Sequence, residues 1–331
     1  MAVEIRFAVP ADEERIVSFI RTHWSGNQTL IRSKDIFRYQ YMTYVPCGFV
    51  LAEENGNIIG LKGYVPMNRT EEPDMAVALA IVEKNSHPML NMEIQRFLEK
   101  QTGCRMMCST GLNPNTSARI YPLFRYHVDK LKQYYKLGES DDFHIAKVIQ
   151  KPETVTEGEA LLCSIPDPET LQSLFNLEDW KGQMPYKDMS YLRYRYFEHP
   201  FYHYEMLGIC QDTKSAEAVI VGREISLQNS KVFRIVDYLG NREAIRRVGL
   251  SLSKLVRSRG WEYVDFYCYG MNDDDMCRAG FVLRDENDPN IIPNYFEPFV
   301  QKNVDIWFFC KQHEQYLICK ADGDQDRPNI Y

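Results

Sequence analysis

The sequence predicts an α/β protein of two similar domains, each with a mixed, mostly antiparallel sheet flanked by helices. Two observations lead to this prediction. At an offset of 157 residues, Phe37-Arg38-Tyr39 aligns with Tyr194-Arg195-Tyr196, and Thr102-Gly103 aligns with Arg259-Gly260. The chain has 331 residues, 44% of them hydrophobic, which is enough for two ordinary cores. A matching order of elements at half the chain length is typical of a duplicated unit.

The first half alternates strands and helices around one clear hairpin. Asn55-Gly56 separates two apolar runs, and this pair adopts positive φ at low cost, which favours a tight turn. Pro10 and Asp12 lead into a helix with apolar spacing. The expected elements are a strand at 4–8, the helix after Pro10, a helical piece around Arg38, the hairpin at 48–67, a strand at 75–83, a helix at 89–100, a strand at 104–110, a helix at 115–124 and a strand at 126–131.

The second half repeats this order. Pro166 and Pro168 mark a helix start, and the helix expected at 242–258 has one apolar and one basic face. Between the halves, charged residues and Pro152 stand where apolar periodicity is lost, which predicts domains at 1–150 and 151–320. The polar stretch ADGDQDRPNIY predicts a mobile tail at 321–331. The other expected elements are a hairpin at 204–225, a strand at 233–240, a strand at 261–269, a short helix within 271–281 and a late strand at 304–310 that completes the second copy.

Charge and cysteine content narrow the class of protein. A net charge of -7 argues against a broad nucleic-acid surface, and nine cysteines in so long a chain indicate buried thiols in a reducing compartment. No apolar run approaches the roughly 20 residues of a membrane span, and the first residues are acidic where a signal peptide is basic and apolar. We therefore expect a cytoplasmic protein without a membrane span.

Two pairs of possible zinc ligands occur at four-residue spacing, His199 with His203 and Cys104 with Cys108. The cysteines lie on an apolar strand, where they act as small hydrophobes, and Pro200 disfavours a helix that carries both histidines. No metal is therefore expected. The motifs of serine hydrolases, P-loop NTPases and dinucleotide-binding oxidoreductases are also missing from the sequence.

The stretch NTSARIYPLFRYHV resembles the end of the GCN5-related N-acetyltransferase domain, in which Asn-x-x-Ala and a tyrosine precede Gly-Phe. Asn115, Ala118 and Tyr121 match this pattern, and the second half keeps Ala279-Gly280-Phe281. The resemblance covers most of the chain as a tandem pair. The stretch YLRYRYFEHPFYHY also resembles acetyltransferase-like proteins encoded with surface-polysaccharide genes.

This resemblance implies an acyl-CoA-dependent N-acyltransferase, in which an amine attacks a thioester, a base removes its proton and an acid protonates the departing thiolate. It makes Tyr121 the candidate acid and Asn115 a candidate contact for the pantetheine arm. Glu83 and Asp237, near the ends of the two central strands, are candidate bases, although surface or capping roles are alternatives. Val82, in the same strand as Glu83, and His87, shortly after that strand, are candidate cofactor contacts, and His87 is also a possible base.

The glycine-rich loop that holds the CoA diphosphate in this family is missing from both halves. VEKNSHPMLN stands in its place in the first half, where Pro88 removes a backbone donor. In the second half Gly240 precedes a helix that carries Arg242 and Arg246, which suits phosphates electrostatically, with a solvated basic face as the alternative.

Arg38 and Arg195 occupy equivalent aromatic-rich helices and are candidate substrate ligands, because a guanidinium fork suits a carboxylate or a sugar phosphate. Packing between helices with an internal salt bridge is the alternative.

The resemblance therefore implies an N-acetyltransferase that uses acetyl-CoA and acts on a small-molecule amine, with an amino sugar or nucleotide-linked amino sugar as the expected acceptor. The first half is the favoured catalytic half because it keeps Tyr121. One alternative is a Fem-type aminoacyl transferase that uses aminoacyl-tRNA, which would need no CoA loop. Another is a non-catalytic binding protein. The acceptor and the oligomeric state stay open.

Overall fold

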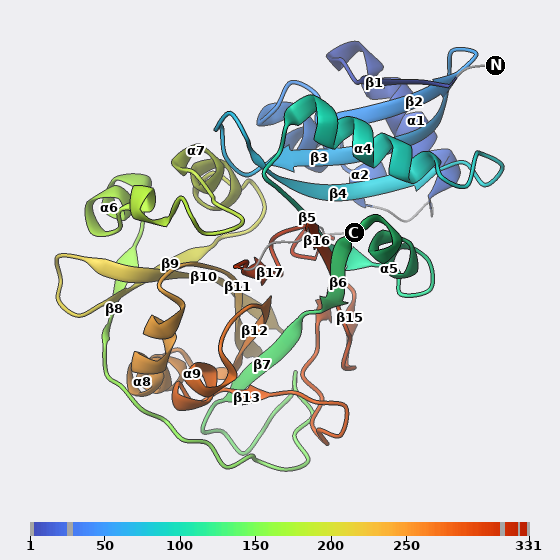
Figure 1. The fold of residues 1–331 in the computed structure, drawn as a ribbon. Helices are drawn as coiled ribbons and strands as arrows, with labels where there is room; N and C mark the ends of the chain where they lie inside the picture. Colours follow the sequence, from blue (N-terminus) through green and yellow to red (C-terminus); the bar gives the residue numbers. More distant parts are fainter. Residues whose placement is uncertain (1–2, 25–28, 312–314, 324, 330–331) are drawn as a thin grey trace.

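The computed structural model describes residues 3–24, 29–311, 315–323 and 325–329, which form two lobes (Figure 1). One lobe contains a seven-stranded sheet and the other an eight-stranded sheet, each flanked by helices. The predicted fold class, α/β with mixed sheets flanked by helices, is confirmed. Within the described ranges, no helix combines the length and the apolar character that a membrane crossing requires.

The first lobe follows the expected order of elements. The Asn55-Gly56 turn has positive φ at both residues, 52° and 78°, and joins the two strands of the predicted hairpin. The elements are β1 (Glu4–Phe7), α1 (Glu13–His23), α2 (Thr29–Arg32), α3 (Lys34–Arg38), a π-helical turn (Tyr39–Thr43), β2 (Phe49–Glu54), β3 (Asn57–Pro66), β4 (Asp74–Val82), α4 (Leu90–Thr102), β5 (Met106–Leu112), α5 (Ser117–Ile120), a 3-10 turn (Tyr121–Phe124) and β6 (Tyr126–Lys130).

The second lobe repeats the pattern and adds a small hairpin. Its elements are β8 (Leu161–Ile165), α6 (Pro168–Leu174), a 3-10 turn (Leu177–Trp180), α7 (Met189–Leu192), a π-helical turn (Arg193–Phe197), β9 (Glu205–Cys210), β10 (Ala216–Leu227), β11 (Ser230–Gly240), a 3-10 helix (Arg242–Arg247), α8 (Gly249–Arg259), β12 (Trp261–Tyr269), α9 (Asp273–Arg278), β13 (Val282–Leu283), β14 (Tyr295–Phe296), β15 (Phe299–Val300) and β17 (Ile318–Cys319).

The repeated glycines mark the ends of equivalent helices. Gly103 follows α4 and Gly260 follows α8, and both have left-handed φ, 60° and 68°, which glycine adopts without steric cost. The prediction of one continuous helix at 242–258 is wrong, because the structure divides this stretch into a 3-10 helix and α8. The carbonyl of Arg247 accepts from the amide of Ala160 at 2.8 Å, and this contact comes at the break between the two helices.

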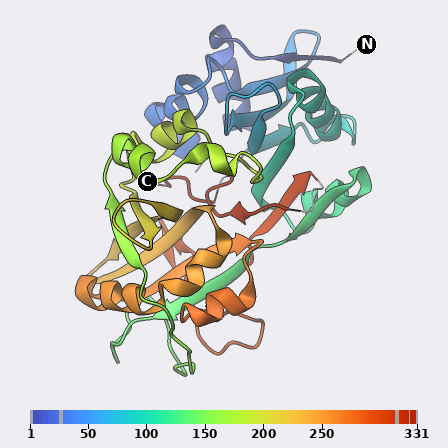
Figure 2. The same cartoon turned by 60° about the vertical axis from the view of Figure 1, so that its left-hand side comes forward.

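The two lobes exchange one strand each. β7 (Lys132–Leu137) follows β6 directly but lies between β12 and β13 in the second sheet, and β16 (Trp307–Lys311) returns to lie between β5 and β6. The late strand expected to complete the second copy therefore completes the first sheet instead. Figures 1 and 2 show the green β7 among the strands of the orange lobe and the dark red β16 beside β5.

After this exchange the strands of the two sheets correspond one to one. The first sheet has the order β1-β2-β3-β4-β5-β16-β6, and the second has the matching order β8-β9-β10-β11-β12-β7-β13. A boundary near residue 150 and an origin by duplication stay predictions.

The two aromatic triplets that align in the sequence meet between the lobes. The rings of Tyr39 and Tyr194 stack with centroids 4.7 Å apart, and each hydroxyl donates to the backbone carbonyl of the other residue. One hydrophobic cluster contains residues of both lobes, including Cys108 of β5 and Val219 of β10. The lobes therefore share a core.

The stretch expected to be a mobile tail is instead buried over much of its described length. Asp322 and Asp326 are 0% and 1% exposed, and the amide of Ala321 donates to the carbonyl of Val236 at 3.0 Å. β17, just before this stretch, pairs with β12. Backbone pairing and buried carboxylates hold the segment, so polar composition alone misidentified it as a tail. Residues 324, 330 and 331 of this prediction lie outside the described ranges.

Candidate functional site

A cavity opens where the parallel strands β4 and β5 diverge. The strands pair only between Asp74–Ala76 and Met106–Cys108. Beyond these residues lies a cavity of about 230 Å³, lined by residues 77–80 of β4 and 109–112 of β5 together with Tyr121 and Phe309. No strand pairing joins the facing edges of β4 and β5 there within the described residues, so backbone groups are available to an extended ligand.

Tyr121 forms part of the cavity wall although its side chain is 3% exposed. Its ring stacks on Phe309 of β16 with centroids 4.0 Å apart, and Tyr126 meets both rings edge to face. Burial raises the pKa of the Tyr121 hydroxyl above its usual value. At neutral pH the hydroxyl is therefore protonated and is a hydrogen-bond donor.

Behind Tyr121 lies Lys62 of β3, which is 0% exposed. Its Nζ donates to Gln95 Oε1 at 2.7 Å, to the carbonyl of Asn91 at 3.1 Å and to Tyr121 Oη at 3.4 Å. These three acceptors match the three hydrogens of an ammonium group. Because the Tyr121 oxygen accepts from Lys62, its own hydrogen is available to a ligand. Burial lowers the pKa of Lys62 to about 7, so its charge changes near neutrality.

Lys62 was missed by the sequence analysis. The available signal was a lysine within the apolar run IIGLKGYV, where a charged side chain has to find buried partners.

The equivalent cleft of the second lobe is filled by the chain itself. β11 and β12 pair from Lys231 to Ile235 on one side and from Trp261 to Phe266 on the other. Beyond this point β17 pairs with Cys268 and Tyr269 of β12, and the Ala321 amide donates to Val236 of β11. Residues 318–321 therefore occupy the space that stays open in the first lobe.

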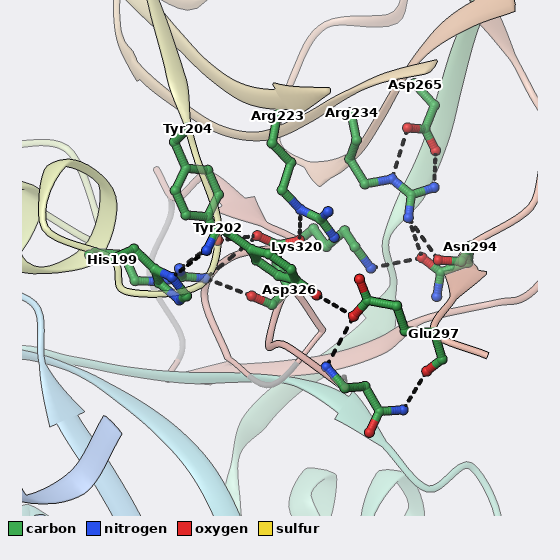
Figure 3. Close-up of polar contacts among 12 residues, drawn as sticks. His199, Tyr202, Tyr204, Arg223, Arg234, Asp265, Asn294, Glu297, Lys320 and Asp326 are labelled. Carbon is green, nitrogen blue, oxygen red and sulfur yellow. Dashed lines mark hydrogen bonds and ion pairs between the residues drawn. The ribbon is translucent and has the colours of Figure 1, made fainter. Parts of the chain in front are cut away.

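A second cavity, of about 240 Å³, adjoins the first and shares Trp24 and Gly111 with it. Figure 3 shows the polar side chains that converge around it. The cavity is lined by Tyr202, Arg223, Arg234, Asn294, Tyr295, Phe296, Glu297, Lys320, Gln325, Arg327 and Asn329, besides the shared residues. Sequence reasoning missed this site because most of its residues come from segments far apart in the chain: the loop before β9, β10, β11, the β14 hairpin and the last segment.

No family model and no curated protein matches the sequence. Solved structures do match the fold. A GCN5-related N-acetyltransferase from Anabaena variabilis superposes with a TM-score of 0.53 at 8% identity, over 93% of this chain and 72% of that one. A conserved protein from Enterococcus faecalis, described as a probable N-acyltransferase, gives 0.53 at 7% identity, over 94% and 72%. The chain has a GCN5-related N-acetyltransferase-like fold. At such identities the likeness establishes the fold alone.

Within this acetyltransferase-like fold, the first-lobe residues predicted from the sequence are dispersed. Val82 ends β4, and the Glu83 carboxylate lies 3.6 Å from His23 Nε2. His87 Nδ1 accepts from the Met89 amide and lies 3.6 Å from the Glu93 carboxylate. Asn115 is exposed on the loop after β5. Among the described residues, the lining of the β4–β5 cavity includes none of these four, whereas Asn113 and Ser117, on either side of Asn115, do line it.

The predicted base of the second lobe, Asp237, is enclosed. Lys187 Nζ lies 2.5 Å from Asp237 Oδ1 and 2.7 Å from Asp322 Oδ1, and the Tyr196 hydroxyl donates to Asp237 Oδ2 at 2.5 Å. Asp237, Cys319 and Asp322 bring possible metal ligands within 4.8 Å of one another, and the Lys187 ammonium lies within ion-pair distance of both carboxylates. The arrangement is that of a buried ion cluster beneath the filled cleft.

The predicted phosphate ligands of the second lobe have internal partners. The Gly240 amide donates to Gln183 Oε1 at 3.1 Å, and Arg242 Nη1 donates to the Gly270 carbonyl at 3.1 Å. Arg246 lies 3.7 Å from the carboxylates of Glu243 and Asp275 on a half-exposed face.

Arg38 and Arg195 align in the sequence but occupy different environments. The Arg38 side chain is 51% exposed and its Nε donates to Glu13 at 2.9 Å. Arg195 donates to the Tyr204 hydroxyl at 2.7 Å and to the Asp326 carbonyl at 3.0 Å, between the lobes. Arg38 therefore makes an exposed ion pair and Arg195 makes buried hydrogen bonds, and a role of either arginine as a substrate ligand stays a prediction.

Proposed function

We propose that the protein is an acyl-CoA-dependent N-acyltransferase that holds the thioester arm of acyl-CoA between β4 and β5 and the acceptor amine in the second cavity. The observation that carries this proposal is the open β4–β5 cleft, with a protonated tyrosine in its wall and a polar cavity adjoining it through Trp24 and Gly111. The acetyltransferase-like fold supports it.

The cleft suits the extended, amide-bearing arm of CoA better than its diphosphate. The unpaired edges of β4 and β5 can hydrogen-bond amides, as an added strand would. The loop from Glu83 to Met89 offers the diphosphate fewer donors, because the amide of Ser86 donates to Glu83 and that of Leu90 to His87. We therefore expect acyl-CoA to gain most of its affinity from the arm and the acyl group.

In the proposed reaction, the amine attacks the thioester carbonyl, the C–S bond breaks, and the CoA sulfur leaves as a thiolate. The Tyr121 hydroxyl donates its proton to this sulfur, and Lys62, which already donates to Tyr121 Oη, returns a proton to the phenolate. A lysine with a pKa of about 7 is suited to this exchange at neutral pH. Glu83, three residues beyond the cavity residue Ala80, stays the candidate base for the amine.

We further propose that acetyl is the acyl group and that the acceptor is an amino sugar or nucleotide-linked amino sugar. The aromatic side chains of Tyr202, Tyr295 and Phe296 in the second cavity support this acceptor, because aromatic faces pack well against sugar rings.

Tyr121→Phe tests the chemistry, since it removes the hydroxyl and keeps the ring on Phe309. We expect a fall in kcat of about 100-fold or more with acetyl-CoA affinity unchanged, the usual size of a lost general acid. Tyr126→Phe is the matched control, because Tyr126 also packs on the Phe309 ring. Its hydroxyl donates to Glu99, and neither Tyr126 nor Glu99 belongs to the cavity lining. Equal rates for wild type and Tyr121→Phe would exclude the acid role.

A further inference from the structure

Four basic side chains line the second cavity, and the three buried ones come from separate parts of the second lobe. Arg223 comes from β10, Arg234 from β11, and Lys320 follows β17 (Figure 3). All three are at least nine-tenths buried, and Lys320 is 2% exposed. Buried cations need acceptors, so their partners show which donors are already used.

Arg234 is fully engaged and serves the structure. Its Nε and Nη2 donate to the carboxylate of Asp265 at 2.9 and 2.6 Å, and its terminal nitrogens also donate to the carbonyls of Pro293 and Asn294. It therefore holds the cavity wall and has little left for a ligand.

Arg223 is only partly engaged. Its Nε donates to Asp326 Oδ1 at 3.0 Å, and its guanidinium lies over the Tyr202 ring, 3.9 Å from the centroid. Among the described residues its two terminal nitrogens have no hydrogen-bond partner, although they lie on a buried side chain that lines the cavity. A guanidinium fixed in this way presents a flat pair of donors, which suits a carboxylate or a phosphate.

Asn294 is the second, independent indication. Its Oδ1 accepts from Lys320 Nζ at 2.7 Å, which fixes the amide orientation. The Asn294 Nδ2 group, on a residue that is nine-tenths buried, then has no acceptor within the described ranges. A buried donor without an acceptor is costly, and a ligand oxygen in the cavity would satisfy it.

We propose that Arg223, Lys320 and Asn294 form an anion subsite that binds a carboxylate or a phosphate carried by the acceptor molecule. The description of the ligand as the acceptor rests on the proposed function, whereas the anion subsite itself does not. The acceptor class is then an anionic amine, such as a phosphorylated amino sugar or an amino acid.

Lys320 adds a measurable signature. Burial and the nearby Arg234 lower the pKa of Lys320 well below its usual range, whereas Asp326 and Asp265 act in the opposite direction and Arg223 in the same one. An anion beside Lys320 raises this pKa again, so binding takes up a proton and weakens as pH rises. Calorimetric titration in two buffers of different ionisation enthalpy measures this uptake.

The experiment is a thermal unfolding series of the full chain in sodium phosphate, sodium acetate or sodium chloride at equal ionic strength and pH 7. We expect a saturable rise of a few degrees in Tm with phosphate or with acetate relative to chloride. A rise in Tm with phosphate but not with acetate indicates a phosphorylated acceptor. A rise in Tm with acetate indicates an acceptor that carries a carboxylate. The absence of a rise with both anions would overturn the proposal.

Two variants locate the effect. Asn294→Asp keeps the acceptor for Lys320 but replaces the Nδ2 donor with a carboxylate oxygen, and Arg223→Gln removes the guanidinium. Both should lose the anion-dependent rise, whereas Arg257→Gln, at an exposed pair with Glu139, should keep it. Retention of the rise in both cavity variants would contradict the assignment.

Acetyl-CoA separates this inference from the proposed function. If acetyl-CoA stabilises the protein and anions bind additively, both proposals are supported. If phosphate competes with acetyl-CoA, the subsite belongs to the CoA phosphates and the assignment to the acceptor is wrong. If acetyl-CoA has no effect while the anion effect maps to Arg223, the proposed function fails and the anion subsite stands.

Discussion

The cleft between β4 and β5 and the cleft between β11 and β12 occupy equivalent places in sheets of the same strand order, but one is open and the other is filled. In the second lobe, residues 318–321 pair with both diverging strands, and Lys187 joins Asp237 and Asp322 beneath them. In the first lobe the corresponding strand edges face a cavity beside Tyr121.

This difference shows that the same strand arrangement can hold either a filled cleft or an open one. A filled cleft satisfies its backbone groups and contributes to stability, whereas an open cleft leaves donors and acceptors for a ligand. The filled lobe also supplies the polar cavity that adjoins the open one. Under the proposed function, the first lobe carries the chemistry and the second lobe carries structure and recognition.

The largest expected effect comes from breaking the filled cleft. Lys187→Met leaves Asp237 and Asp322 buried without their cation, and we expect the free energy of unfolding to fall by about 3–5 kcal/mol. Chemical denaturation at pH 7 measures this loss. Lys254→Met, at an exposed pair with Glu159, is the control and should unfold like wild type. A small loss in Lys187→Met would show that the ion cluster does not hold the filled cleft together.

Filling the open cleft should remove ligand binding without a comparable loss of stability. Ala80 is an exposed residue of β4 that lines the cavity, and Ala80→Phe places a ring in the space assigned to acyl-CoA. Wild type should gain about 2.7 kcal/mol at 100 times the dissociation constant of acetyl-CoA, and the variant should gain almost nothing.

Thermal unfolding with and without acetyl-CoA measures both values, and Ala80→Ser, which keeps the space, should behave as wild type. Normal stabilisation of Ala80→Phe would place the acyl-CoA site elsewhere.

The aligned arginines offer a comparison between the two lobes. Arg195→Met removes buried hydrogen bonds to Tyr204 and Asp326, and we expect a loss of about 2 kcal/mol in the free energy of unfolding. Arg38→Met removes an exposed pair with Glu13 and should leave stability nearly unchanged. Denaturant titration of the two variants checks this, and equal losses would mean that the environments are more alike than the contacts indicate.

The smallest effect concerns the pH dependence of Lys62. Its folded-state pKa of about 7 lies below the unfolded value near 10.5, so the unfolded chain binds more protons between these values and stability rises with pH. Relative to Lys62→Met, wild type should gain about 1 kcal/mol between pH 7 and pH 8. Unfolding curves at both pH values measure this difference, and a difference independent of pH would mean that Lys62 is not neutralised by burial.

The local elements were predictable where a few neighbouring residues decide them. Asn55-Gly56 indicated the hairpin, and Gly103 and Gly260 marked equivalent helix ends because only local backbone conformation is involved. Tyr121 was named from a short motif and lines the cavity. Gly240, Arg242 and Arg246 looked like a phosphate site in sequence. Gly240 and Arg242 have hydrogen-bond partners from distant segments, Arg246 lies near Glu243 on a half-exposed face, and their role as phosphate ligands stays a prediction.

The amino-acid sequence by itself determined the α/β class, the repeated order of elements and the position of most strands, because periodicity and turn residues act over a few positions. Only the tertiary structure decided that β7 and β16 exchange lobes, that the last segment fills one cleft, and that Lys62 lies behind Tyr121. Each of these depends on pairing between residues far apart in the chain, and such pairing is chosen by the burial of whole surfaces rather than by any local pattern.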